Sequence, residues 1–177
     1  MINHDPGGKV ELAMLPGMRG DAVFSEDGRF RYWLSREWYE SSYGAIPYML
    51  SIGMNPSTAR ADVDDPTIRR DIELAKREGF ERLIKVNVMD LRATSPKRLL
   101  VETPCSDQNR PTIRMLAREA GKIVVCTGRL HKKLRRYGDA VIGDLRGHTL
   151  WCLGKNDDGS PKHPLYLRAD TPLINYP

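Results

Sequence analysis

The stretch YMLSIGMNPS, residues 48–57, decides which fold this chain is expected to adopt. Its first half is a short, mostly apolar run, typical of a strand buried on both faces of a parallel sheet. Gly53 permits a tight exit from that strand, and Pro56 stiffens the loop that follows. Asn55 could orient a water molecule or hydrogen-bond a base edge, but it could equally form an ordinary Asx turn.

Strands and helices alternate beyond this stretch. Further strands are predicted at residues 83–89, 122–126 and 150–153. Helices are predicted from Asp65-Pro66 to Gly79, from about Asp107 to Gly121, and over residues 129–145, with a break at Gly138 or near Gly143 left open. This alternation implies right-handed crossovers and a mostly parallel sheet.

Polar residues follow each predicted strand at the point where it ends. Ligands of parallel sheets bind at the carboxyl ends of the strands. Three of the loops start at Asn55, Asn87 and Thr127, and a fourth leads to His163. We therefore expect these four loops to converge on one edge of the sheet.

The segment before residue 48 is expected to add a β-hairpin. Asp27-Gly28 lies between two aromatic, β-prone runs at residues 22–25 and 30–34, which is a hairpin signal. Residues 1–20 are rich in Gly, Pro and Met and are expected to be poorly ordered or extended. Residues 21–177 are predicted to form a single domain.

Composition narrows the class of protein. The 177 residues are 40% hydrophobic and 29% charged, as in ordinary globular domains. No apolar run approaches the roughly 20 residues of a membrane helix, and the first residues do not resemble a secretory signal, so a cytoplasmic location without membrane contact is expected. The net charge of +5 is compatible with a polyanionic partner such as nucleic acid.

Cofactor-binding signatures are missing from the sequence. Cys105, Cys126 and Cys152 are odd in number and widely spaced, which argues against a disulfide framework, a structural zinc or a four-cysteine cluster. There is neither a P-loop nor a dinucleotide-binding glycine motif. No cofactor is expected.

Three carboxylates stand close together before the first predicted helix. Asp62, Asp64 and Asp65 could bind a hard cation, or one of them could act as a general base, since close carboxylates raise one another's pKa. Alternatively, Asp65 caps the helix and the others favour its positive end. The residues alone leave both interpretations open.

Two basic clusters and one histidine complete the candidates. The clusters, which could meet a nucleic-acid backbone or simply form solvated helix faces, are Arg69 with Arg70, and Lys132, Lys133, Arg135 and Arg136. His163 lies in a Pro- and Gly-rich loop, where it could act as an electrophile or acid, or be structural.

Four ordered motifs carry a family resemblance: GMNPST at 53–58, DPTIRR at 65–70, VNVMDLRAT at 86–94 and HPLY at 163–166. From about Phe30 onward the chain resembles a bacterial and phage family, domain of unknown function number 1643. More distantly, the motifs are similar to those of the uracil-DNA glycosylase superfamily, which carry Gly-x-x-Pro, Asn-Val-Val and His-Pro-Ser in this order. That resemblance implies a three-layer α/β/α sandwich with a mostly parallel central sheet.

The resemblance also implies roles for individual residues. Asn55 would position the attacking water, Asn87 would read a flipped base, and His163 would stabilise charge on the departing base. Asp64 is the further catalytic candidate, as a general base. The expected substrate contacts are Gly53, Met54, Pro56, Ser57, Asn87, Arg92, Pro164 and Leu165.

Two departures from the glycosylase pattern bear on activity. No aromatic residue lies between Ser57 and Gly79 to stack on a base, and the cluster cysteines of one branch are missing. Three hypotheses follow: an enzyme acting on an N-glycosidic bond of a normal or modified base in DNA or a nucleotide, a non-catalytic nucleotide or nucleic-acid binding module, and a metal-dependent phosphoryl-transfer enzyme using Asp62, Asp64 and Asp65. The oligomeric state is left open.

Overall fold

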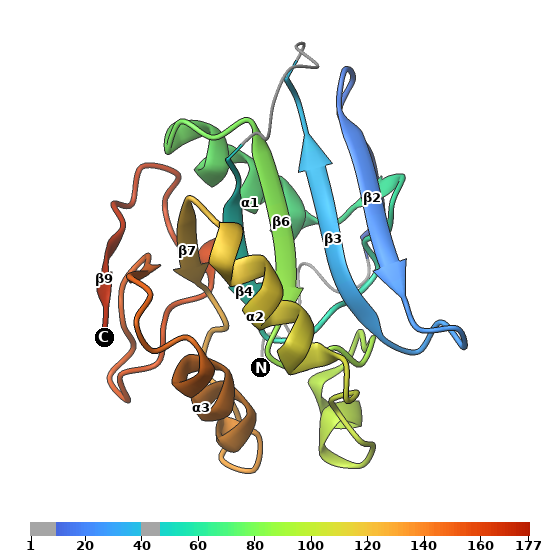
Figure 1. Cartoon of the computed structure of the whole chain (residues 1–177), viewed down its shortest axis with the longest axis vertical. Coiled ribbons are helices and arrows are strands. Elements are labelled where there is room, and N and C mark those ends of the chain that lie inside the picture. The colour runs from blue at the N-terminus through green and yellow to red at the C-terminus, as the bar shows by residue number, and fades with distance from the viewer. Residues whose placement is uncertain (1–9, 40–46) are drawn as a thin grey trace.

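A seven-stranded sheet runs through the computed structural model, which describes residues 10–39 and 47–177 (Figure 1). The strand order is β2-β3-β6-β4-β7-β8-β9. The bounds are Arg19–Phe24 for β2, Arg31–Glu37 for β3, Met49–Gly53 for β4, Arg82–Asn87 for β6, Lys122–Val125 for β7, Leu150–Cys152 for β8 and Ile174–Tyr176 for β9. A second, small sheet pairs β1, Leu12–Ala13, with β5, Val63–Asp64.

The predicted α/β class is confirmed, but the sheet is mixed. The four central strands β6-β4-β7-β8 pair in parallel, and the outer strands β2, β3 and β9 pair antiparallel to their neighbours. β3 is fed by a tight hairpin from β2, and a hairpin connection makes neighbouring strands antiparallel. The expectation of a mostly parallel sheet therefore holds for the centre alone.

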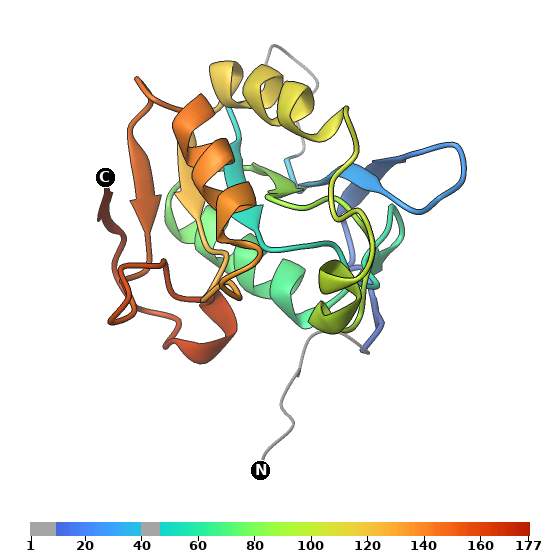
Figure 2. The same ribbon diagram turned by 90° about the horizontal axis from the view of Figure 1, so that it is seen from below.

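Helices cover both faces of the sheet (Figures 1 and 2). Helix α1, Pro66–Arg77, packs Ile68 and Ile72 against one face, in a cluster with Met49 and Leu83. Helices α2, Asn109–Glu119, and α3, Arg135–Asp144, lie on the opposite face. Successive residues of a strand point to opposite faces of the sheet. The next residues along, Leu50 and Ile84, therefore pack on the face covered by α2 and α3, in a second hydrophobic core.

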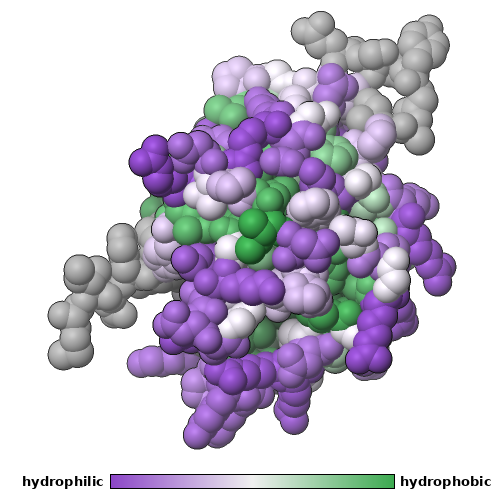
Figure 3. Space-filling view, turned by 90° about the vertical axis from the view of Figure 1, so that its left-hand side faces the viewer, coloured by the Kyte–Doolittle hydropathy of each residue, from purple (hydrophilic) through white to green (hydrophobic). Residues whose placement is uncertain are grey.

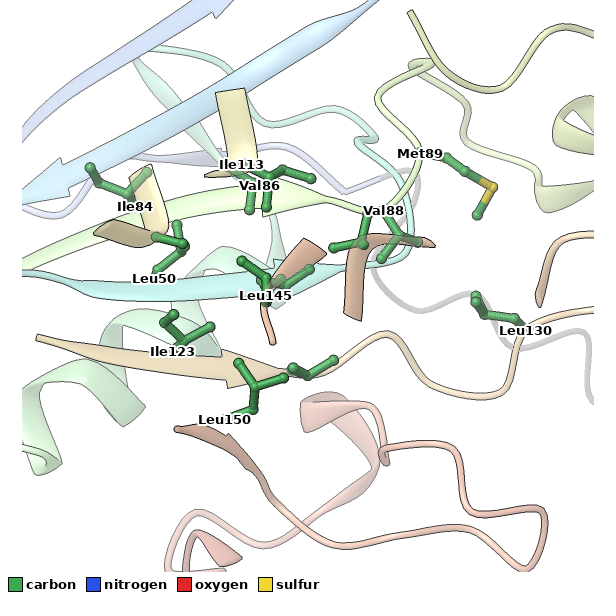
Figure 4. Close-up of a cluster of buried hydrophobic side chains, with 14 of the residues drawn as sticks. Leu50, Ile84, Val86, Val88, Met89, Ile113, Ile123, Leu130, Leu145 and Leu150 are labelled. Atoms are coloured by element: carbon green, nitrogen blue, oxygen red, sulfur yellow. The ribbon is translucent and has the colours of Figure 1, made fainter. Parts of the chain in front are cut away.

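That second core is the larger of the two. Figure 4 shows Leu50, Ile84, Val86 and Ile123 of the central strands gathered with Ile113 of α2. Each of these five side chains is at most 3% exposed. The sheet is thus fixed between two apolar layers, which leaves its carboxyl edge to the loops.

Several local predictions are confirmed. Residues 19–37 form the β2–β3 hairpin, and Asp65 caps α1, with its carboxylate accepting from the Ile68 N–H at 2.8 Å and Pro66 in the first turn. The third helix starts at Arg135, later than predicted, because residues 132–134 form a turn. Gly138 and Gly143 lie inside α3 without a break.

The two ends of the chain add elements at the margins of the sheet. Of the N-terminal segment expected to be poorly ordered or extended, residues 1–9 lie outside the described part. Residues 10–20 contain β1, a turn at residues 16–17 and the start of β2. The tail adds β9, and Figure 3, which looks onto that side, shows a mainly hydrophilic surface with smaller hydrophobic areas. Among residues 10–39 and 47–177, no helix has the length and apolar character needed to cross a membrane.

Candidate functional site

The loops that leave β4 and β6 are bound to each other along their length. Backbone N–H groups of Val88 and Met89 donate to the carbonyls of Gly53 and Met54 at 2.9 and 3.0 Å. Further out, the Ala93 N–H donates to the Pro56 carbonyl at 2.9 Å. Two of the loops expected to converge therefore form one structured wall at the carboxyl edge.

The order of the parallel strands places a crevice at the same edge. Across β6-β4-β7-β8 the strands are second, first, third and fourth along the chain. In sheets of this order ligands bind beyond the carboxyl ends of the first and third strands, here β4 and β7. The loops concerned begin at Met54 and Cys126.

Asn55 holds this wall together through its side chain. Its Nδ2 atom donates to the carbonyl of Ala93 at 2.7 Å and to that of Pro56 at 2.9 Å. The side chain is half-buried, and within the described residues no hydrogen bond to its Oδ1 atom is found. The amide is thus anchored by its donor end.

Asn87, at the end of β6, is more deeply buried than Asn55. It is 2% exposed, and its Oδ1 atom accepts from Arg31 Nη2 at 3.1 Å. Arg31 is equally buried, and burial lowers its pKa to about 10. The two side chains form a buried polar pair between β3 and β6.

Gly53 serves a purpose other than the expected tight exit. Its backbone does not adopt a positive φ, but a Cβ there would come within 2.8 Å of Asn87 Nδ2 and 3.0 Å of Lys85 Nζ. Glycine is therefore required because two polar side chains lie against this strand, a close approach that any Cβ would obstruct.

A buried polar cluster that the sequence analysis missed lies below Gly53. Lys85 Nζ contacts Asp71 Oδ2 at 2.7 Å, Ser51 Oγ at 3.0 Å and Cys126 Sγ at 3.4 Å. All four side chains are at most 3% exposed. Burial opposes the charged form of Lys85, but the Asp71 carboxylate raises its pKa above the usual value, so it stays an ammonium.

The signal for this cluster was present as polar residues within apolar patterns. Ser51 interrupts the run of β4, Lys85 interrupts that of β6, and Asp71 falls on the apolar face of α1, three residues after Ile68. A buried charge needs a partner, so such positions indicate pairing across elements.

The three acidic residues before α1 have separate partners. Asp64 is fully buried between Arg36 Nε at 2.7 Å and Arg69 Nε at 2.6 Å. Asp62 is exposed beside Arg60, and Asp65 caps α1, where burial raises its pKa. Within the part of the chain that the structure describes, no group of His, Cys, Asp and Glu side chains is placed to hold a metal ion.

His163 lies where the tail meets the loop after β7. A Cβ at Gly128, whose φ is +69°, would be 3.3 Å from His163 Cβ, so glycine lets the two loops touch. His163 begins the short helix η2, Pro164–Tyr166, and its Nδ1 accepts from the Leu165 N–H at 3.4 Å. In η2, Pro164 is buried and Leu165 half-buried.

A cavity of about 340 Å³ adjoins the β4 and β6 loops. Two residues expected to contact substrate, Ser57 and Arg92, line it together, and Arg29 and Arg98 join them without having been anticipated. The remaining lining residues are Glu11, Gly28, Thr58, Leu91, Ala93 and Thr94.

The residues expected to meet a nucleic-acid backbone are divided between two faces. Arg69 and Arg70 belong to α1, and Arg70 donates to the Leu167 carbonyl at 2.7 Å. Lys132, Lys133, Arg135 and Arg136 lie at the start of α3, across the sheet, where Arg135 pairs with Asp158 at 3.1 Å. They do not form one continuous basic surface.

The fold and this edge define an α/β protein whose parallel strands present a structured, partly polar carboxyl edge. The chain belongs to the family described as "Protein of unknown function (DUF1643)", whose model matches residues 31–165. That match runs from Arg31 to Leu165 and so includes Asn55, Asn87 and His163. Neither the curated proteins nor the solved structures include a significant match.

Proposed function

We propose that this protein binds a nucleotide unit, free or within DNA, at the carboxyl edge and hydrolyses its N-glycosidic bond. The observation that carries the proposal is the cavity that Ser57 and Arg92 share beside the Asn55 loop. Ala93 lines this cavity and accepts the hydrogen bond from Asn55 Nδ2, so Asn55 is bonded directly to a residue of the cavity wall.

Two side chains supply the chemistry in this proposal. The Asn55 Oδ1 atom would accept from a water molecule and direct its oxygen at the anomeric carbon of the sugar. As the C–N bond breaks, its electron pair leaves with the base, and the imidazole of His163 would stabilise the negative charge that develops on the base oxygen. The water's proton passes to the departing base, which completes the hydrolysis.

One observation favours the second candidate, a nucleotide-binding module without bond cleavage. Asn87 would have to read the base, yet it is 2% exposed and its Oδ1 accepts from Arg31. A binding module needs only the cavity and no base contact from Asn87.

A base-release assay separates the two candidates. DNA containing uracil, 5-hydroxymethyluracil or hypoxanthine, and the matching free nucleotides, would be incubated with the protein and with variants. We expect release that falls about a hundredfold or more in His163→Ala and Asn55→Ala. His148→Ala, which changes an exposed histidine elsewhere, should leave the rate unchanged. No release from any substrate rejects the hydrolase, and nucleotide binding retained in that case supports the binding module.

A further inference from the structure

We infer that the cavity lined by Arg29, Arg92 and Arg98, called here the arginine cavity, binds a phosphoryl or phosphodiester group. The inference rests on the proposed function for the identity of the whole ligand, a nucleotide unit, but the anion site itself follows from the local contacts. The walls come from the turn of the β2–β3 hairpin, the loops after β4 and β6, and the short helix η1, Pro96–Leu100.

The charge balance of the arginine cavity is positive. Among residues 10–39 and 47–177, three guanidinium groups line it against one carboxylate, Glu11, which pairs with Arg60 at 3.0 Å. Glu102, which is not part of the lining, pairs with Arg29 at 3.3 Å and Arg98 at 2.8 Å. Arg60 also pairs with Asp62 at 3.3 Å, so four guanidinium groups face three carboxylates, and an anion would restore the balance.

Arg92 is held in place before any ligand arrives. Its backbone N–H donates to the Arg29 carbonyl at 2.9 Å, and its Nη1 donates to the Gly28 carbonyl at 3.0 Å. The guanidinium carbon also lies 5.0 Å from the centre of the Phe24 ring. A side chain fixed in this way loses little conformational entropy when it binds an anion.

The Nε atom of Arg92 is buried and has no hydrogen-bond partner within the described residues. Buried donors are nearly always paired, so the protein contacts of this guanidinium leave part of its hydrogen-bonding capacity unused. A guanidinium fork matches the oxygen spacing of a phosphate, to which it donates two parallel hydrogen bonds.

Hydroxyl-bearing residues on the same walls suit a tetrahedral anion. Ser57, Thr58 and Thr94 line the cavity on the β4 and β6 loops, and Arg92 lies on the β6 loop as well. Phosphate oxygens commonly accept from serine and threonine hydroxyls as well as from arginine. Asn55 donates to the carbonyl of Ala93, a residue of this lining, which connects the proposed anion site to the Asn55 loop.

Isothermal titration calorimetry with inorganic phosphate tests the anion site. Arg92→Gln and Arg98→Gln should each weaken binding about tenfold. Arg118→Gln removes the same charge from an exposed position on α2 and should leave the affinity unchanged. Glu102→Gln frees two arginines and should tighten binding. Circular dichroism would show whether each variant is folded. If Arg92→Gln does not fold, Arg98→Gln still tests the site, because Arg98 is exposed and its substitution does not disturb the core.

Equal weakening in Arg92→Gln, Arg98→Gln and Arg118→Gln, or no phosphate binding at all, would overturn the inference. A second set of titrations assigns the source of the phosphate: thymidine, thymidine 5′-monophosphate and a short single-stranded oligodeoxynucleotide. The affinity for thymidine should be the same in Arg98→Gln as in the wild type. The affinity for whichever phosphorylated ligand binds more tightly should fall in Arg98→Gln. Equal binding of all three ligands contradicts a phosphate site.

The anion site and the proposed function can fail separately. Arginine-dependent phosphate binding without base release rejects the hydrolase alone. Base release that is insensitive to Arg92→Gln and Arg98→Gln, with phosphate binding that is equally insensitive, rejects the anion site alone.

Discussion

The ammonium group of Lys85 lies 2.7 Å from the Asp71 carboxylate, and both side chains are buried between the sheet and α1. The pair joins the second parallel strand to the helix that precedes it. Removing one member of a buried ion pair leaves the other uncompensated, which is far costlier than replacing both by apolar residues.

Lys85→Ala should therefore lower the free energy of unfolding by about 3–5 kcal/mol, and Lys85→Met with Asp71→Leu should recover much of that loss. Urea unfolding at neutral pH measures both. The control is Arg168→Ala, which breaks the exposed pair with Asp170 and should leave the midpoint unchanged. A double variant no more stable than Lys85→Ala would show that the ion pair itself, rather than the unpaired charge, sets the stability.

Gly53→Ala should also destabilise the protein, by about 1–3 kcal/mol, because the new Cβ displaces Asn87 and Lys85. Gly143→Ala is the matched control. Its Cβ would meet open space in α3, so this substitution should stabilise by roughly 0.5–1 kcal/mol. Thermal unfolding of the two variants compares them directly, and equal effects would mean that Gly53 is not required for close approach.

The three free cysteines should resist alkylation in the native protein. Burial raises the pKa of the Cys105 thiol to about 11, and burial likewise raises that of Cys126. At pH 8 both are thiols, which are poor nucleophiles compared with thiolates. Mass spectrometry after iodoacetamide treatment should show slow labelling at pH 8 and rapid labelling in urea. Fast native labelling of Cys126 would contradict its burial.

Acid should remove a contribution that Asp144 makes to stability. Hydrogen bonds from Arg110 and Arg114 lower the pKa of Asp144 in the folded protein. The contribution is present above the unfolded pKa of about 4 and is lost as the pH falls through the lower folded value. The difference in melting temperature between wild type and Asp144→Asn should shrink between pH 7 and pH 2. A difference independent of pH would contradict the assignment.

Local signals in the sequence predicted much of the fold. The Asp27-Gly28 turn, the Asp65-Pro66 cap and the apolar runs of the central strands act over a few residues, and the structure has all of them. β9 was not predicted, because its three residues gain stability from pairing with β8 rather than from their own pattern.

The candidate site was predictable only in part. Ser57 and Arg92 were identified from motifs, but Arg29 and Arg98 enter the same cavity through folding of the hairpin turn and η1. The pairing of Asp64 with Arg36 could not be inferred, since Arg36 lies 28 positions earlier in the chain and meets Asp64 only after the sheet forms. Contacts between distant segments depend on topology, which a local pattern does not contain.

The contact between Gly128 and His163 has a consequence for biosynthesis. During translation β4, β6 and β7 leave the ribosome well before the segment that carries His163, and they can pair while that segment is still inside the exit tunnel. A nascent chain would thus pair β4, β6 and β7 before His163 can reach Gly128. Any ligand chemistry that depends on His163 would begin only after this central part of the sheet has formed.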